Sequence, residues 1–299
     1  MSFFQAIVLG LIQGVTELFP VSSLGHSVIL PAFFGWTDIV AAQDASESYF
    51  LAFLVGLHVA TALALAWYFR ADWRRIIGAL LDSIARRTID TPTARLGWLL
   101  VVATIPAGLL GVIFEHQLRV VFAKPFLAGV LLFINGLILL AGERLRRRSS
   151  RPSARPLRLG PPVRDTARDG VRELDTLEFR EAGAIGVAQV FALLAGISRS
   201  GITMVAGLLR GLDHEDAARF SFLLATPIIL AAGVYKLPDL LGPNGAGVQG
   251  QVLAGSIAAA LAAYVSVRFL SRYFTTRTLT PFALYCLIAG IVTVVRFHS

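Results

Sequence analysis

The 299-residue chain is 56% hydrophobic and only 15% charged, and its mean hydropathy is +0.70. A soluble protein of this length buries its core with far less apolar content, so the composition excludes an ordinary soluble domain and predicts a polytopic membrane protein. The net charge of +8 comes mostly from arginines between apolar runs, which favours cytoplasmic loops facing anionic lipid and gives no reason to expect a nucleic-acid partner.

Residues 2–36 are apolar but are interrupted by a polar motif. Residues 13–26 read Gln-Gly-Val-Thr-Glu-Leu-Phe-Pro-Val-Ser-Ser-Leu-Gly-His, in which Pro20 and Gly25 break the helix. Each arm is shorter than the roughly 20 residues that a membrane span needs. We therefore predict a re-entrant helical hairpin with its tip at residues 20–23. A single tilted, proline-kinked helix is the alternative.

Three membrane spans and a charged linker follow the first hairpin. The apolar runs predict spans at 48–69, 96–114 and 122–141, with a short interfacial helix at 76–85 and a loop at 115–121. Arginine and proline then dominate residues 143–182, which we interpret as a partly disordered cytoplasmic linker.

The second half repeats the pattern of the first. An apolar stretch at 183–211 is broken at 195–201, Ala-Gly-Ile-Ser-Arg-Ser-Gly, and is again followed by three predicted spans, at 217–236, 251–270 and 281–297. An offset of 176 residues places Ser22 on Ser198 and also pairs Gly10 with Gly186 and Gln13 with Gln189.

Three spans are an odd number, so the second copy enters the membrane from the opposite face. The fold expected is all-α, with an inverted repeat of residues 1–142 and 183–299, each half a re-entrant hairpin plus three transmembrane helices, and with sites near the midplane where the hairpins meet. The positive-inside bias places both termini outside, so that the first hairpin opens outward and the second opens to the cytoplasm.

The first tip carries groups suited to catalysis. Glu17 is a base or a metal ligand, Ser23 supplies a hydroxyl and His26 an imidazole, which together are the parts of nucleophilic or general acid–base chemistry. His26 as a hydrogen-bonded packing residue is the alternative.

The second tip carries groups suited to binding phosphate. An arginine with hydroxyls and a glycine at the start of a helix forms a phosphate cradle, because the guanidinium and the free backbone N–H groups both favour negative charge. The candidate phosphate-binding residues, with one serine from the first tip, are Ser22, Ser198, Arg199, Ser200, Gly201 and Thr203. The serines and the threonine could instead cap the second arms of the hairpins, and Arg199 could form a structural ion pair with Glu17.

These two motifs resemble a known family. Residues 13–26 are similar to the first signature of the undecaprenyl-diphosphate phosphatases of the bacitracin-resistance type, and residues 196–203, Gly-Ile-Ser-Arg-Ser-Gly-Ile-Thr, are similar to the second. Residues 58–72 resemble the family's first long span. Gln13 stands where a second carboxylate is common, and Ala195 replaces the proline that opens the second motif.

The resemblance implies an enzyme of the bacterial plasma membrane. Its expected substrate is a polyprenyl diphosphate lipid, from which it would release the terminal phosphate to recycle the carrier lipid of cell-wall synthesis. Catalysis is expected from Glu17, Ser23, His26 and Arg199, with Ser23 and His26 both open as the nucleophile. A divalent cation, Mg²⁺ or Ca²⁺, would bind Glu17, with Gln13 as a second candidate ligand. A homodimer is compatible with the sequence, which leaves the oligomeric state open.

Two rival functions differ from this one in testable ways. A phosphatidic-acid-type lipid phosphatase needs a histidine six residues after the arginine, where this chain has Val205. A lipid transporter or flippase is the rival of a different class, because inverted repeats with re-entrant hairpins also suit alternating access.

Overall fold

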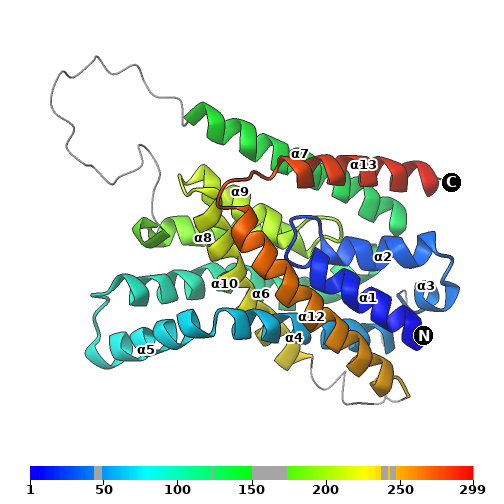
Figure 1. The fold of residues 1–299 in the computed structure, drawn as a ribbon, viewed down its shortest axis with the longest axis horizontal. Helices are drawn as coiled ribbons and strands as arrows, with labels where there is room; N and C mark the ends of the chain where they lie inside the picture. Colours follow the sequence, from blue (N-terminus) through cyan, green and yellow to red (C-terminus); the bar gives the residue numbers. More distant parts are fainter. Residues whose placement is uncertain (44–48, 123, 150–173, 237–241, 243–246, 299) are drawn as a thin grey trace.

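The computed structural model describes residues 1–43, 49–122, 124–149, 174–236, 242 and 247–298, and all regular structure in these ranges is helical (Figure 1). The elements in chain order are α1 (Phe3–Thr16), α2 (Ser23–Phe33), α3 (Thr37–Gln43), α4 (Tyr49–Tyr68), α5 (Arg70–Arg86), α6 (Pro92–Phe122), α7 (Pro125–Ser149), η1 (Leu174–Thr176), α8 (Phe179–Val190), η2 (Phe191–Leu193), α9 (Arg199–Leu209), α10 (His214–Tyr235), α12 (Gln249–Tyr273) and α13 (Thr280–Arg296).

The helices confirm an all-α membrane protein. Within the described part of the chain, five helices are long and apolar enough to cross a bilayer: α4, α6, α7, α10 and α12. The last predicted span corresponds to α13, an apolar helix of 17 residues that extends about 25 Å at 1.5 Å per residue, the lower limit for a span. Large apolar side chains such as Leu109, Leu261 and Ile288 point outward from these helices, as a lipid-facing surface requires.

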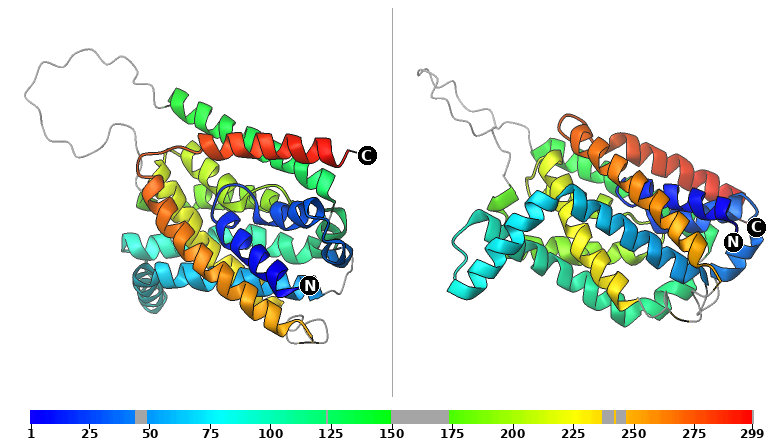
Figure 2. Two further views of the ribbon diagram at one scale, coloured as in Figure 1. Left: turned by 45° about the vertical axis from the view of Figure 1, so that its right-hand side comes forward. Right: turned by 60° about the horizontal axis from the view of Figure 1, so that its bottom comes forward.

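Each broken stretch folds back on itself as a hairpin. The N-terminal ammonium group of Met1 lies 3.3 Å from Asp38 Oδ2, which joins the start of α1 to the segment after α2. In the second half the N–H of Leu174, just before α8, donates to Asp216 Oδ2 on α10 at 3.1 Å. The first hairpin opens toward the end of the molecule that holds both termini, and the second opens toward the end that carries α5 (Figures 1 and 2).

Two of the helix pairs correspond under the predicted repeat. Helix α1 packs along α12 and α8 packs along α6, whereas α7 packs along α13, and α4 packs against both α12 and α10. The predicted repeat exchanges α1 with α8 and α6 with α12, so it converts the first pair into the second. Glycine permits both crossings, because a Cβ on Gly10 would overlap the backbone of Gly255 and one on Gly186 would overlap the backbone of Ala103. The inverted orientation of the halves in the membrane stays a prediction.

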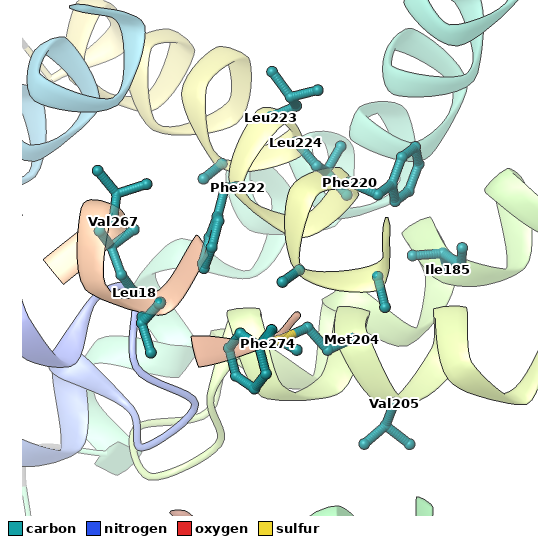
Figure 3. Packing of buried hydrophobic residues seen from close by; sticks show 14 of the residues in the cluster. Leu18, Ile185, Met204, Val205, Phe220, Phe222, Leu223, Leu224, Val267 and Phe274 are labelled. Carbon is teal, nitrogen blue, oxygen red and sulfur yellow. The ribbon is translucent and has the colours of Figure 1, made fainter. Parts of the chain in front are cut away.

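The apolar core lies directly beside the polar tips. Leu18, Met204, Phe222 and Phe274 are almost fully buried and belong to one cluster (Figure 3). Three of them are chain neighbours of polar residues of the site: Leu18 follows Glu17, Met204 follows Thr203, and Phe222 follows Ser221, which lies on α10 beside the second tip. Core packing therefore fixes the backbone from which those polar side chains project.

Two predicted boundaries differ from the structure. The loop expected at 115–121 is helical, because residues 112–122 contain neither glycine nor proline and α6 continues to Phe122. The linker expected from residue 143 begins later, since α7 runs to Ser149. Glu143 is buried there and accepts hydrogen bonds from His214 and from the N–H of Leu279. The interfacial helix is part of the longer α5, and residues 150–173 of the linker lie outside the described residues.

Candidate functional site

The first tip is a turn between α1 and α2 with one strained residue. Ser22 has φ +68°, a left-handed conformation that is unfavourable for a residue with a side chain. Its hydroxyl accepts a hydrogen bond from Gly25 N at 3.3 Å and so caps α2. The same oxygen accepts from Gly196 N of the second tip at 3.0 Å, which links the two motifs through one side chain.

The second tip is longer than expected, and its helix starts earlier. The arm predicted to reach Leu194 leaves the α-helix at Val190, and α9 begins at Arg199 rather than at Ile202. Ser198 explains the early start, because its hydroxyl caps the helix by accepting from Gly201 N at 3.1 Å. The capping alternative is thus observed for Ser198, as it is for Ser22.

Glycine is required in the second tip for close packing. Gly196 has φ +119°, and a Cβ there would collide with the carbonyl oxygen of Ala128 and the side chain of Leu131 on α7. The tip therefore lies directly against α7, where a residue with a side chain would not fit.

The two tips are hydrogen-bonded to each other through α7. Asn135 donates from Nδ2 to the carbonyl of Pro20 at 3.0 Å and accepts through Oδ1 from Ser198 N at 3.0 Å. Ser200 adds a direct bond, from its hydroxyl to the carbonyl of Phe19 at 3.2 Å. The expectation that the two broken hairpins meet in one site agrees with this geometry.

Glu17 is the centre of the site. It is 7% exposed, and its Oε2 accepts from the hydroxyl of Ser23 at 2.5 Å and from Nε2 of Gln13 at 3.1 Å. Its Oε1 accepts from the guanidinium of Arg199 at 3.1 Å. His58 Nε2, on α4, lies 3.6 Å from Oε2. A buried carboxylate is costly unless it is paired and hydrogen-bonded, and three of the four partners of Glu17 come from the predicted site residues.

Arg199 and Thr203 both contact α10. The second terminal nitrogen of Arg199 donates to the carbonyl of Ser221 at 3.4 Å. Thr203 caps no helix. Its hydroxyl lies 2.7 Å from the Ser221 hydroxyl and within hydrogen-bonding distance of the carbonyls of Arg199 and Ser200. The guanidinium is therefore held between Glu17 and α10, with its orientation fixed by two acceptors.

His26 lies in the first tip but is bonded elsewhere. Its Nδ1 lies 2.7 Å from the carbonyl of Ser22, and its Nε2 lies 2.7 Å from the hydroxyl of Tyr285, whose ring stacks on the imidazole at 5.8 Å. Both ring nitrogens are thus engaged, and neither bond involves Glu17 or Ser23. The arrangement resembles the packing alternative more than that of an activated nucleophile.

The residues around Glu17 fit a hard divalent cation. Mg²⁺ and Ca²⁺ prefer oxygen ligands, and Mg²⁺ is commonly bound by one or two carboxylates together with substrate phosphates. Glu17, Ser23 and Gln13 supply carboxylate, hydroxyl and amide oxygens, and Gln13 Oε1 is buried without a hydrogen-bond partner. The described residues contain no group of three His, Cys, Asp or Glu side chains for a cation, so phosphate oxygens would have to complete the coordination.

Sequence reasoning missed three residues of the site. His58, Asn135 and Ser221 come from α4, α7 and α10, each of which was predicted only as a span. A signal was present, because a polar residue within an apolar span usually faces the protein interior or a functional cavity. Nothing in one sequence indicated which of these polar residues would face the tips.

Comparison with known proteins identifies the family. A family profile described as "Bacitracin resistance protein BacA" matches residues 6–292. The chain belongs to this family. It is 54% identical to a protein of Frankia alni named undecaprenyl-diphosphatase 2, over 99% of this chain and 98% of the relative. It is also 56% and 55% identical to proteins named undecaprenyl-diphosphatase from Mycolicibacterium paratuberculosis and Mycobacterium avium, each over 97% of this chain and 95% of the relative.

Family membership extends over the hairpins and the spans. The matched range begins within α1 and ends within α13, so both tips and every helix between them lie inside it. The resemblance drawn from residues 13–26 and 196–203 is confirmed. The names of these relatives do not favour a transporter.

Proposed function

We propose that this chain is an integral-membrane hydrolase that removes the terminal phosphate of undecaprenyl diphosphate, giving undecaprenyl phosphate and inorganic phosphate. The observation that carries the proposal is the junction of the two tips, where a Ser23–Glu17 pair meets Arg199 from the other half of the chain. A nucleophile with its base and a cation for phosphate are the minimum that phosphoryl transfer needs. The shared name of relatives at 54–56% identity supports the same substrate.

Ser23 is the proposed nucleophile. Its hydroxyl donates to Glu17 Oε2 at 2.5 Å, so its proton has an acceptor in place. The serine oxygen bonds to the terminal phosphorus while the bond from that phosphorus to the bridging oxygen breaks, and the proton passes to Glu17. Water then attacks the phosphoserine, the Ser23–phosphorus bond breaks, and the serine regains a proton.

The second tip is proposed to hold the diphosphate. Arg199 can turn one guanidinium edge to the phosphate oxygens without losing its bond to the Ser221 carbonyl. The start of α9, with Ser198, Ser200 and Gly201, adds hydroxyls and a helix dipole that favour negative charge. A divalent cation at Glu17, when bound, would neutralise charge that develops on the phosphate.

The test is phosphate release by the purified protein in detergent, with undecaprenyl diphosphate labelled on its terminal phosphate. We expect release of one phosphate per substrate, abolished by a chelator and by Ser23→Ala, but not by Ser271→Ala on α12. After acid quenching, label on the protein should be acid-stable, as phosphoserine is. Acid-labile label would identify His26 as the nucleophile. The absence of any turnover would favour a transporter over an enzyme.

We also propose that the site receives phosphate from the outer face of the bacterial plasma membrane. The argument is that the Arg-rich segments mark the cytoplasmic end, whereas the hairpin with Glu17 and Ser23 opens toward the other end. In a Cys286→Ala background, Thr37→Cys should react with a membrane-impermeant thiol reagent outside intact cells, and Asp82→Cys on α5 should not. Both positions are exposed. The reverse pattern would overturn the orientation.

A further inference from the structure

The unexplained contact of the site is His58. It projects from α4 and is partly buried, with a side-chain exposure of 23%, and its Nε2 lies 3.6 Å from Glu17 Oε2. That distance exceeds the 2.7–3.2 Å typical of an N–H···O hydrogen bond. The contact is close enough to matter electrostatically and too long to be a direct bond.

The other ring nitrogen decides which atom His58 presents to the carboxylate. Nδ1 lies 2.8 Å from the carbonyl oxygen of Leu54, one turn earlier on α4. A carbonyl oxygen only accepts hydrogen bonds, so Nδ1 must carry the hydrogen. In the neutral imidazole, Nε2 is then unprotonated, and its lone pair faces Glu17. Two electron-rich atoms facing each other are unfavourable unless something positive lies between them.

Gln13 points to the same place. Its Nε2 donates to Glu17 Oε2, while its own Oε1 is buried without a partner. Rotating the amide by 180° would turn the unpartnered oxygen toward Glu17 and His58, which is unfavourable by itself and favourable around a cation. Oε2 of Glu17 is thus approached by Gln13, Ser23 and His58 from three helices, α1, α2 and α4.

We propose that His58 supplies a nitrogen ligand, through Nε2, to the divalent cation of this site. Two ligand atoms that each lie about 2.1–2.4 Å from a shared ion are about 3–4 Å apart, which includes the observed 3.6 Å. A backbone bond from Nδ1–H, like the one to Leu54, is the usual support of a histidine ligand. The inference rests on the proposed function only in assuming that the site takes a cation.

A nitrogen ligand changes which cation the site prefers. Imidazole binds Mn²⁺ and later transition metals better than it binds Ca²⁺, which is bound almost entirely by oxygen. We therefore expect His58 to raise the affinity for Mn²⁺ relative to Ca²⁺. The rival explanation is an imidazolium paired with Glu17, in which no metal contacts the ring.

The test is pulsed electron paramagnetic resonance of Mn²⁺ bound to the purified full-length protein, alone and with methylene diphosphonate. A ligating histidine gives ¹⁴N modulation of the echo decay. We expect modulation in the native protein, its loss in His58→Gln, and its retention in His298→Gln. His298 is a matched control, because its Nδ1 also bonds a backbone carbonyl but it lies exposed at the C-terminal end.

Titration of the same three proteins supplies the second readout. His58→Gln should weaken Mn²⁺ binding about tenfold or more and Ca²⁺ binding much less, because glutamine still offers an oxygen. Absence of Mn²⁺ binding, absence of ¹⁴N modulation in the native protein, or modulation that persists in His58→Gln would each overturn the proposal. A native-like size-exclusion elution profile of His58→Gln would show that the variant is folded. Even if it were not, the presence or absence of ¹⁴N modulation in the native protein would test the proposal by itself.

The measurements separate this inference from the proposed function. Nitrogen-coupled Mn²⁺ in a protein that releases no phosphate would uphold the ligand and refute the phosphatase. Phosphate release with no nitrogen coupling would uphold the phosphatase and refute the histidine ligand.

Discussion

Replacing Arg199 with lysine tests whether the arginine acts through its geometry or only through its charge. The guanidinium donates to Glu17 Oε1 at 3.1 Å and to the Ser221 carbonyl at 3.4 Å, so it contacts two elements at once. A lysine ammonium has one nitrogen and cannot span both acceptors while also binding phosphate. Losing one hydrogen bond to a charged group is worth about 1.5–3 kcal/mol, or roughly 10- to 150-fold in rate.

We therefore expect Arg199→Lys to lower kcat/KM for undecaprenyl diphosphate by about 100-fold while the thermal midpoint changes little, because Glu17 keeps a cationic neighbour. Phosphate release and thermal unfolding in the same detergent measure the two effects. The matched control is Arg219→Lys, since Arg219 is half-exposed and pairs with Asp72 on α5. Near-native turnover in Arg199→Lys would refute the geometric role and leave only an electrostatic one.

Three further predictions test the scaffold and the linker. Asn135→Leu should lower the free energy of unfolding by about 1–3 kcal/mol, measured by chemical denaturation, because it leaves the buried N–H of Ser198 unpaired and leaves the Pro20 carbonyl only its weak bond from the Cys286 thiol; unchanged stability would mean that the Asn135 hydrogen bonds between the tips do not stabilise the fold. Gly10→Ala should lower the thermal midpoint because its Cβ would overlap the backbone of Gly255, whereas Gly108→Ala, whose Cβ meets nothing within 4 Å, should not. Equal midpoints would mean that α1 and α12 can move apart to accommodate the methyl group at no cost in stability. Replacing residues 150–172 with a neutral Gly/Ser linker should preserve turnover in correctly inserted protein, and loss of turnover would reveal a functional element there.

The architecture could be predicted because hydropathy and helix breakers act locally. Pro20 lies in the turn between α1 and α2, and the polar motif marks that turn; Gly25, predicted to break the helix, instead lies in the first turn of α2, where its N–H donates to the capping Ser22. The boundaries that failed depended on tertiary contacts. Glu143 looked like the first residue of a charged linker, but the bond from His214, far along the chain, allows it to be buried inside a continuing helix.

The site could be predicted in composition but only partly in geometry. The motifs placed Glu17, Ser23 and Arg199 in one group, and the structure brings them into direct contact. The orientation of His26 could not be foreseen, because it is set by Tyr285, more than 250 residues away. The contact of His58 with Glu17 could not be predicted either, since it depends on which face of α4 lies against α1.

The divergence between the two halves underlies the proposal that one side of the junction serves catalysis and the other binds phosphate. Both tips keep the same capping serine, at Ser22 and Ser198, so both start a helix with its N-terminus directed at the junction. Two such termini facing each other would concentrate positive potential with nothing to balance it. Glu17 in one half supplies the compensating charge and Arg199 in the other half pairs with it, so a phosphate that binds the arginine must share or displace its bond to the carboxylate. Binding phosphate would then free Oε1 of the same carboxylate whose Oε2 accepts from Ser23, and this would link occupancy of the site to activation of its proposed nucleophile.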